Sequence, residues 1–303
     1  MGPSVVRPFP PRWQGLAFLA ALCAVALAAC RGEPASLLNE LAEARRVSAD
    51  LRLQFSQASD ASNRAVMADT DEASVAFAHE AEQGKQAVHM DVEKLAPHLH
   101  SLGYAAEARW LEEFTRRFAD YGRLDETVLA LAVENTNLKA QRLSFGPAHQ
   151  AADQFRDALD ALVSSAAAKS ASKSERCIES VAARAILAVR DVQVLQAPHI
   201  AEADDAAMSR IEAEMSRLHA VAADAVRELA RRAEAQPTLE AASASLERFT
   251  DLSAQIVALS RRNSNVRSLA LSLRDKPPLT ARCEDSLRSL DEALAKEGFS
   301  ATR

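Results

Sequence analysis

Histidine and cysteine are the residues of this sequence whose spacing could support chemistry, and the histidines argue against most of it. None of the seven histidines stands three residues after a glutamate, so the Glu-x-x-His signature of di-iron bundles is absent. No C-x-x-C-H, G-x-S-x-G, H-E-x-x-H or phosphate-loop motif occurs. His98 and His100 flank Pro97 and could bind a metal weakly, but a solvated turn is the favoured interpretation. We therefore predict that the protein is not an enzyme and holds no metal or cofactor.

Two asparagines lie on apolar helical stripes, where a buried amide must find hydrogen-bond partners. Asn135 stands at a stripe position, and Asn263 repeats this arrangement later in the chain. One interpretation is that each asparagine fixes the register of a helical bundle, as a single asparagine does in coiled coils. The other is that each contacts a ligand or water inside the bundle. We favour the first and keep both residues as candidate positions; Asn137 and Asn265 are expected to face outward or towards a neighbouring helix.

Four cysteines occur, and two of them belong to the N-terminal region described next. The other two are Cys177 and Cys283. Their expected positions along the bundle differ by on the order of 20 Å, whereas a disulfide needs Cα atoms within about 7 Å. We therefore predict free thiols.

The first 29 residues have the pattern of an export signal. Arg7 and Arg12, with no acidic residue, precede an apolar run that is shorter than the roughly 20 residues of a membrane span. The run ends in Leu27-Ala28-Ala29-Cys30, which resembles the lipobox of bacterial lipoproteins. The resemblance implies cleavage before Cys30 and attachment of palmitate-like acyl chains there. A plain signal peptide or an uncleaved anchor is the alternative.

The lipobox resemblance also implies a location. Arg31, rather than an aspartate, follows the cysteine. In lipoproteins of two-membrane bacteria this pattern points to the outer membrane, with the protein facing the periplasm. Residues 30–34 are then expected to form a short tether.

The composition favours helix throughout. The 303 residues are 48% hydrophobic and only 5% aromatic, and they include 8 glycines, too few for an α/β fold with glycine-rich turns. A net charge of -6 argues against a nucleic-acid binder. We predict an all-α fold with helices at about 35–68, 71–96, 103–144, 148–170, 174–197, 201–234, 238–275 and 279–297. The third carries the clearest stripe, and its Trp110, Phe114, Phe118 and Tyr121 are expected in the core.

An internal repeat emerges when the chain is shifted by 128 residues. The shift places Tyr121 on Phe249, Asn135 on Asn263, Asn137 on Asn265, and Ser144 on Ser272. This predicts a tandem duplication, with antiparallel four-helix bundles at 35–168 and 169–303. The stretch 164–173 is either a flexible linker or part of a long continuous helix that the two bundles share.

The repeated unit resembles the sensor domain of methyl-accepting chemotaxis receptors. The residues that carry the resemblance are the segments 63–71, 134–140 and 262–267. It implies binding of small solutes, often in dimers, with signals passed along helices. The chain departs from the family because we find no second membrane span, relay domain or cytoplasmic signalling coil, so a partner would have to carry any signal.

We therefore expect a lipid-anchored binding or accessory module for a small solute or a protein partner. The alternative is a structural helical spacer of the cell envelope with no small-molecule ligand. Contacts are expected with the membrane through the lipid, with a signalling partner and with a second copy in a homodimer, but not with nucleic acid. A cavity lined by Asn135 or Asn263 would favour the first function; a solid seam with both amides satisfied would favour the second.

Overall fold

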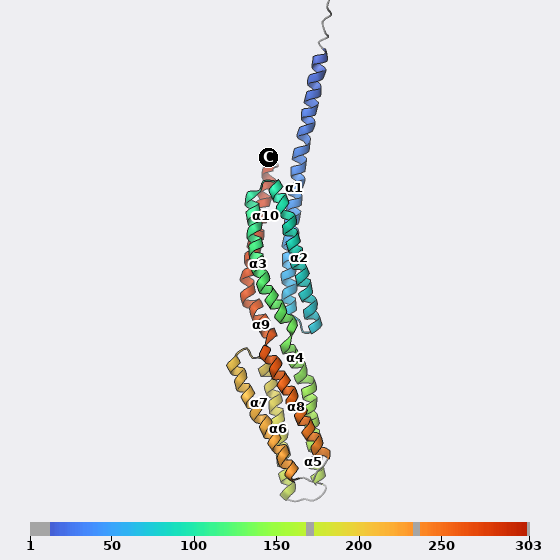
Figure 1. Cartoon of the computed structure of the whole chain (residues 1–303), viewed down its shortest axis with the longest axis vertical. Helices are drawn as coiled ribbons and strands as arrows, with labels where there is room; N and C mark the ends of the chain where they lie inside the picture. The colour runs from blue at the N-terminus through green and yellow to red at the C-terminus, as the bar shows by residue number, and fades with distance from the viewer. Residues whose placement is uncertain (1–12, 168–172, 233–236, 302–303) are drawn as a thin grey trace, which may run out of the picture. The chain divides into compact units, whose positions relative to one another are not determined.

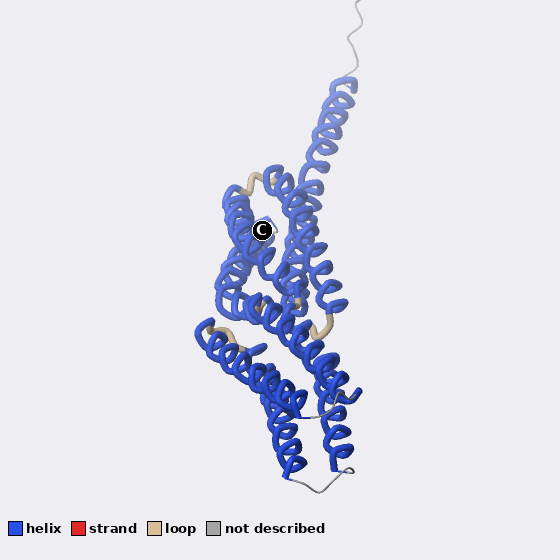
Figure 2. Tube along the Cα trace, turned by 60° about the horizontal axis from the view of Figure 1, so that its bottom comes forward, coloured by secondary structure: helices blue, strands red, loops and turns tan. Residues whose placement is uncertain are grey.

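The described part of the protein is helical. The computed structural model describes the backbone of residues 13–167, 173–232 and 237–301, and the side chains of 36–167, 176–232 and 237–297. Figure 2 shows helices joined by short loops, with no strand among these residues. The prediction of an all-α helical bundle fold is confirmed.

Two long helical runs, each interrupted at one asparagine, organise the chain (Figure 1). The first comprises α3 (Ala105–Glu134), α4 (Thr136–Leu143), the π-helix η1 (Ser144–Ala148) and α5 (His149–Ala167). The second comprises α8 (Pro237–Arg262), α9 (Ser264–Ala270), the π-helix η2 (Leu271–Asp275) and α10 (Lys276–Ala301). The remaining helices are α1 (Trp13–Met67), α2 (Asp71–Ser101), α6 (Lys173–Ala201) and α7 (Asp205–Arg232).

Prolines that were expected to end helices lie inside the two runs. Pro147 is part of η1, and Pro277 and Pro278 lie in the first turn of α10, which follows η2. A proline lacks the N–H group and crowds the carbonyl four residues earlier, and the wider π turn relieves this crowding. The predicted breaks at 146–147 and 277–278 are therefore wrong, and each helical run continues through them.

The helices α2 and α6 also continue beyond an internal proline. Pro97 lies inside α2 and Pro198 inside α6, so the predicted ends at 96 and 197 come a few residues too early. After α2 the chain turns at Gly103, whose φ of 71° lies in the left-handed region that glycine adopts most readily. At the start of α2, Thr70 Oγ1 accepts a hydrogen bond of 3.1 Å from the Ala73 N–H.

The chain forms two compact units that differ from the predicted bundles. Unit 1 consists of Met1–Gln57, Gln83–Asp120 and Leu279–Arg303. Unit 2 consists of Ala58–Glu82 and Tyr121–Pro278. Unit 1 therefore takes its helical segments from α1, α2, α3 and α10, whereas the predicted first bundle used the segment 148–170 as its fourth helix.

The reason for this difference is the continuity of the two runs. Within unit 1, Ser48 on α1 donates a hydrogen bond of 2.7 Å to Asp291 Oδ1 on α10. Arg45 on α1 donates one of 2.7 Å to the carbonyl oxygen of Leu294. Within unit 2, α5 instead packs with α6, α7 and α8 around a common apolar core. Because the chain does not turn back at Pro147 or Pro277, the predicted division at 168/169 is not the boundary between the units.

Unit 1 has an aromatic core. The ring of Phe55 meets Phe114 and Phe118 edge-on, with 5.9 Å between centroids in both pairs. Phe114 and Phe118 stack at 5.6 Å. Trp110 was expected beside them but is 39% exposed, so that part of the stripe prediction is wrong.

The N-terminal predictions fall mainly outside the described residues. Residues 1–12 are not described, and neither is the side chain of Cys30. The backbone of residues 30–34, predicted as a tether, belongs to α1. Within the described part of the chain, none of the helices combines the length and the apolar character of a membrane span.

The packing of α10 on α1 predicts a specific cross-link. In a background with Cys30, Cys177 and Cys283 replaced by serine, Ser48→Cys with Asp291→Cys should form a disulfide under mild oxidation, because the two side chains touch. Mass spectrometry of a tryptic digest should recover the linked peptides, and the Ser48→Cys single variant is the control. Failure of the pair to cross-link in folded protein would contradict this packing.

Candidate functional site

Asn135 and Asn263 are the single non-helical residues that separate α3 from α4 and α8 from α9. Both adopt the left-handed conformation, with φ of 51° and 53°, which asparagine tolerates better than most residues. Both are buried, with exposed fractions of 0% and 7%. The helices α4 and α9 begin directly after them, so the first backbone N–H groups of each have no acceptor within the helix.

Those N–H groups are satisfied by the other run, at a contact that we call the crossing (residues 135–137 and 263–265). The Thr136 N–H donates to Ser264 Oγ, and the Ser264 N–H donates to Thr136 Oγ1, each at 3.0 Å. Asn137 and Asn265 exchange the same kind of bond, each N–H donating to the partner's Oδ1 at 3.1 Å. All four bonds join residues 128 apart, which is the shift of the sequence repeat.

The side-chain amides complete the crossing. Asn265 Nδ2 donates to Asn135 Oδ1, and Asn137 Nδ2 donates to Asn263 Oδ1, both at 2.8 Å. Asn263 Nδ2 donates at 2.8 Å to the carbonyl oxygen of Glu202. The corresponding atom of the first run, Asn135 Nδ2, is buried without a partner. Asn137 and Asn265 therefore face the opposite run, and the two cavities described below are not lined by either candidate asparagine.

A second buried polar group lies among η1, α6 and α8. Ser144 Oγ donates to Gln196 Oε1 at 2.6 Å, and Gln196 Nε2 donates to Ser253 Oγ at 3.1 Å. Gln196 is 1% exposed and Ser253 is 2% exposed. Ala148 and Phe249 lie one helical turn from Ser144 and Ser253 in the sequence. We call these five residues the neutral layer.

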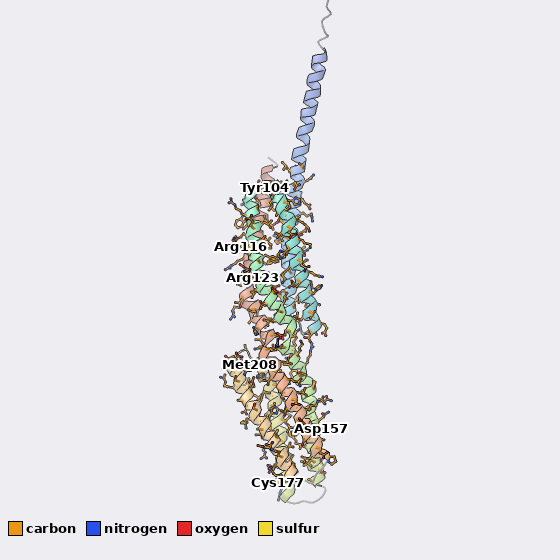
Figure 3. All side chains as sticks on the ribbon, in the orientation of Figure 1. Tyr104, Arg116, Arg123, Asp157, Cys177 and Met208 are labelled. Atoms are coloured by element: carbon orange, nitrogen blue, oxygen red, sulfur yellow. The ribbon has the colours of Figure 1, made fainter. Side chains whose placement is uncertain are left out.

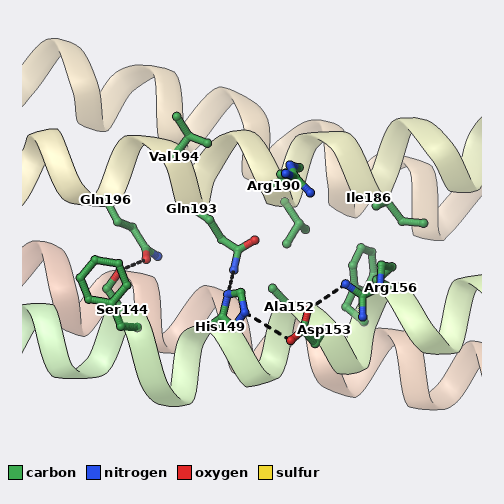
Figure 4. A pocket seen from close by; sticks show the side chains of 13 residues that line it. Ser144, His149, Ala152, Asp153, Arg156, Ile186, Arg190, Gln193, Val194 and Gln196 are labelled. Atoms are coloured by element: carbon green, nitrogen blue, oxygen red, sulfur yellow. Dashed lines mark hydrogen bonds and ion pairs between the residues drawn. The ribbon is translucent and has the colours of Figure 1, made fainter.

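A pocket of about 290 Å³ opens beside this layer (Figure 4). Residues of η1, α5 and α6 line it, and Ser144 and Gln196 form part of its wall. Phe145 and Val194 on its lining are 69% and 65% exposed, so the pocket combines apolar surface with polar groups.

Most charged groups of the pocket are already paired. Arg156 Nη1 lies 2.9 Å from Asp153 Oδ1, and the same arginine also contacts Asp157. The hydrogen bond to Asp157, followed by the charges of Asp157 and Asp153, raises the pKa of Arg156. His149 Nε2 lies 3.4 Å from Asp153 Oδ2, and its Nδ1 lies 3.2 Å from Gln193 Nε2.

Arg190 is the exception. It lines the pocket, and among the described residues it forms no ion pair or hydrogen bond; Figure 4 draws no contact to it. The carboxylate of its sequence neighbour, Asp191, interacts with Arg217 on α7 instead. The pKa of Arg217 is raised by the hydrogen bond to Glu214 and further by the charge of Asp191. The pocket therefore presents one uncompensated positive charge.

The neutral layer also borders a groove of about 470 Å³ between α7 and α8. Ser253 lines it together with Glu212, His219 and Val257. Burial lowers the pKa of His219, so this imidazole is neutral at pH 7.

The groove's carboxylate is held by protein groups. A hydrogen bond from Arg261, and then one with the buried His199, lower the pKa of Glu212. Because these partners compensate the charge of Glu212, the groups that the groove offers to a solute are hydroxyls, a neutral imidazole and apolar surface.

The remaining candidates are not assembled into a site. Cys177 and Cys283 are free, as predicted. Cys177 lies near the N-terminal end of α6 (Figure 3), and burial raises the pKa of the Cys283 thiol to about 12. His98 Nδ1 lies 2.6 Å from Glu40 Oε2, and the described residues contain no cluster of metal-ligand side chains.

Sequence reasoning missed Arg190 and Gln196. A signal for Gln196 was present, because it follows the buried Val189 and Val192 at helical spacing, as Asn135 follows its own stripe. Arg190 had none, since an arginine on a helix exterior is usually solvated. Comparison of the sequence with models of protein families and with curated proteins gives no match.

The crossing predicts unequal roles for its two asparagines. Asn135→Gly and Asn263→Gly both preserve the left-handed backbone, but Asn263 loses two side-chain hydrogen bonds and Asn135 only one. Asn263→Gly should therefore lower the free energy of unfolding by about 1 kcal/mol more than Asn135→Gly. Urea denaturation followed by circular dichroism measures the difference, and equal losses would contradict the assigned bonds.

Proposed function

We propose that the protein is a lipid-anchored binding module of the cell envelope, and that the pocket between α5 and α6 holds a small solute. The observation that carries the proposal is Arg190, an unpaired cation on the lining of a pocket that also exposes hydroxyl and amide groups. The resemblance to chemotaxis sensor domains supports the same class of function. An accessory role beside a membrane-spanning signalling partner is consistent with it.

The electrostatics of the pocket favour a solute with an anionic group. Asp153 and Asp157 compensate Arg156, so they leave Arg190 as the cation available to a ligand. A guanidinium binds a carboxylate or phosphate in a bidentate geometry. The exposed Phe145 and Val194 offer apolar contact to the rest of the molecule.

A structural spacer is the second candidate, and the crossing favours it. Asn263 is satisfied entirely by protein groups, and Asn135 retains a single unpartnered atom in a buried site. Such a seam fixes the register of helices and needs no solute. Native mass spectrometry of protein purified from its own envelope separates the two functions, because a retained small molecule is expected only for the binding module.

Loss of Arg190 should weaken anion binding. Isothermal titration calorimetry with acetate, succinate, benzoate and inorganic phosphate is the measurement, since these probes span the size and charge of small anions. Arg190→Gln should weaken any probe that binds wild type by about tenfold or more, as expected for loss of a charge-assisted bond.

Arg210→Gln is the matched control, because it removes the same charge from an exposed position of α7 outside the pocket. Equal affinities for the two variants would contradict the site. If none of the probes binds wild type and the purified protein retains no small molecule, the spacer is the better description.

Lipid attachment at Cys30 is tested independently. Cells fed an alkyne-tagged palmitate should label the wild-type protein. The Cys30→Ala variant should carry no label and should be recovered in the fraction that contains no membranes. Cys177→Ser is the control, because it removes a thiol that the proposal leaves unmodified. Labelling of Cys30→Ala at wild-type level would contradict the proposed anchor.

A further inference from the structure

Unit 2 contains a buried ion pair close to the crossing. Lys276, the first residue of α10, is 2% exposed, and its partner Asp125 on α3 is fully buried. Lys276 Nζ lies 2.8 Å from Asp125 Oδ1, and it donates to Ser62 Oγ at 2.5 Å and to Asn63 Oδ1 at 3.3 Å. The ring centroid of Tyr121 lies 5.4 Å from the ammonium nitrogen. With Ser272, these residues are called the charged layer.

Four positions of the charged layer and the neutral layer are equivalent under the repeat. The shift of 128 residues places Asp125 on Ser253, Lys276 on Ala148, Ser272 on Ser144, and Tyr121 on Phe249. Ser272 Oγ donates to Asn63 Oδ1 at 3.3 Å, just as Ser144 Oγ donates to Gln196 Oε1. The same scaffold therefore holds a full ion pair in one layer, and a serine and an alanine in the other.

We infer that the charged layer is an ammonium-binding site which the protein fills with its own lysine. A carboxylate, a hydroxyl, an amide oxygen and an aromatic face are the groups that bind a primary ammonium, and three oxygens match its three N–H donors. A buried charge is costly unless it is paired and fully hydrogen-bonded, and Lys276 meets both conditions.

This inference does not depend on the proposed anion pocket, which borders the other layer. It assigns Lys276 a ligand-like role: its butylammonium chain is bound by the layer as a free alkylammonium ion would be. Removing the side chain beyond Cβ should leave a cavity with the shape and charge complement of n-propylammonium.

Chemical rescue tests the assignment. Lys276→Ala in the full chain should have a lower Tm than wild type, and n-propylammonium chloride should raise that Tm in a saturable manner. The same salt should leave the Tm of wild type and of Lys296→Ala unchanged, because Lys296 is an exposed lysine of the same helix. n-Propanol and sodium chloride, which lack the ammonium group or the propyl chain, should not rescue Lys276→Ala.

Two further variants separate binding from general stabilisation. Lys276→Met fills the cavity, so propylammonium should not raise its Tm. Lys276→Ala with Asp125→Ser introduces the residues that the neutral layer has at these two positions; it should fold and should not respond to propylammonium.

The assignment is overturned if propylammonium and propanol act equally on Lys276→Ala, or if the double variant responds as the single variant does. If Lys276→Ala does not fold alone, circular dichroism after refolding with propylammonium is the readout, and absence of recovered helix also overturns it.

Discussion

The structure of unit 2 depends on the way in which two interrupted helices cap each other. A left-handed asparagine releases the first N–H groups of the following helix, and buried N–H groups without acceptors are costly. Thr136, Asn137, Ser264 and Asn265 remove that cost in trans, because each supplies its side-chain oxygen to the backbone of the other run. Neither interruption would be stable without the other, so the two runs must meet at this level.

The two polar layers differ in how they satisfy their buried groups. One keeps a full charge in the interior and satisfies it with Asp125, Ser62 and Asn63. The other uses only the neutral groups of Ser144, Gln196 and Ser253, and these residues also line two cavities. A buried ion pair offsets its desolvation cost only when further hydrogen bonds satisfy its remaining groups, whereas buried neutral groups carry a smaller cost.

The sequence was sufficient for the helical class, because helical periodicity is a local pattern. Periodicity also identified Phe114, Phe118 and Tyr121 as buried. The hydrogen bonds between residues 128 apart at the crossing were not predicted, because the shift was interpreted as two separate bundles. The predicted connections between the helices were wrong. Proline rules predict a turn at Pro147, but a π turn absorbs the proline, and only tertiary packing decides between the two outcomes.

The candidate site was harder to predict. Asn135 and Asn263 were singled out as polar residues on an apolar stripe, but their left-handed backbone has no signature beyond the residue type. The charge that the pocket offers to a ligand depends on which of its ionised groups have no partner. To identify them, one must know which arginines Asp153 and Asp191 approach in the fold. Charge composition alone does not contain this information.

The way in which unit 1 is completed limits how the chain can be divided. Unit 1 is completed by α10, from the end of the sequence, while α5, from its middle, serves unit 2. Neither half of the sequence contains a complete unit 1, because that unit combines three separate stretches of the chain. A fragment that ended before α10 would leave unit 1 without one of its helices.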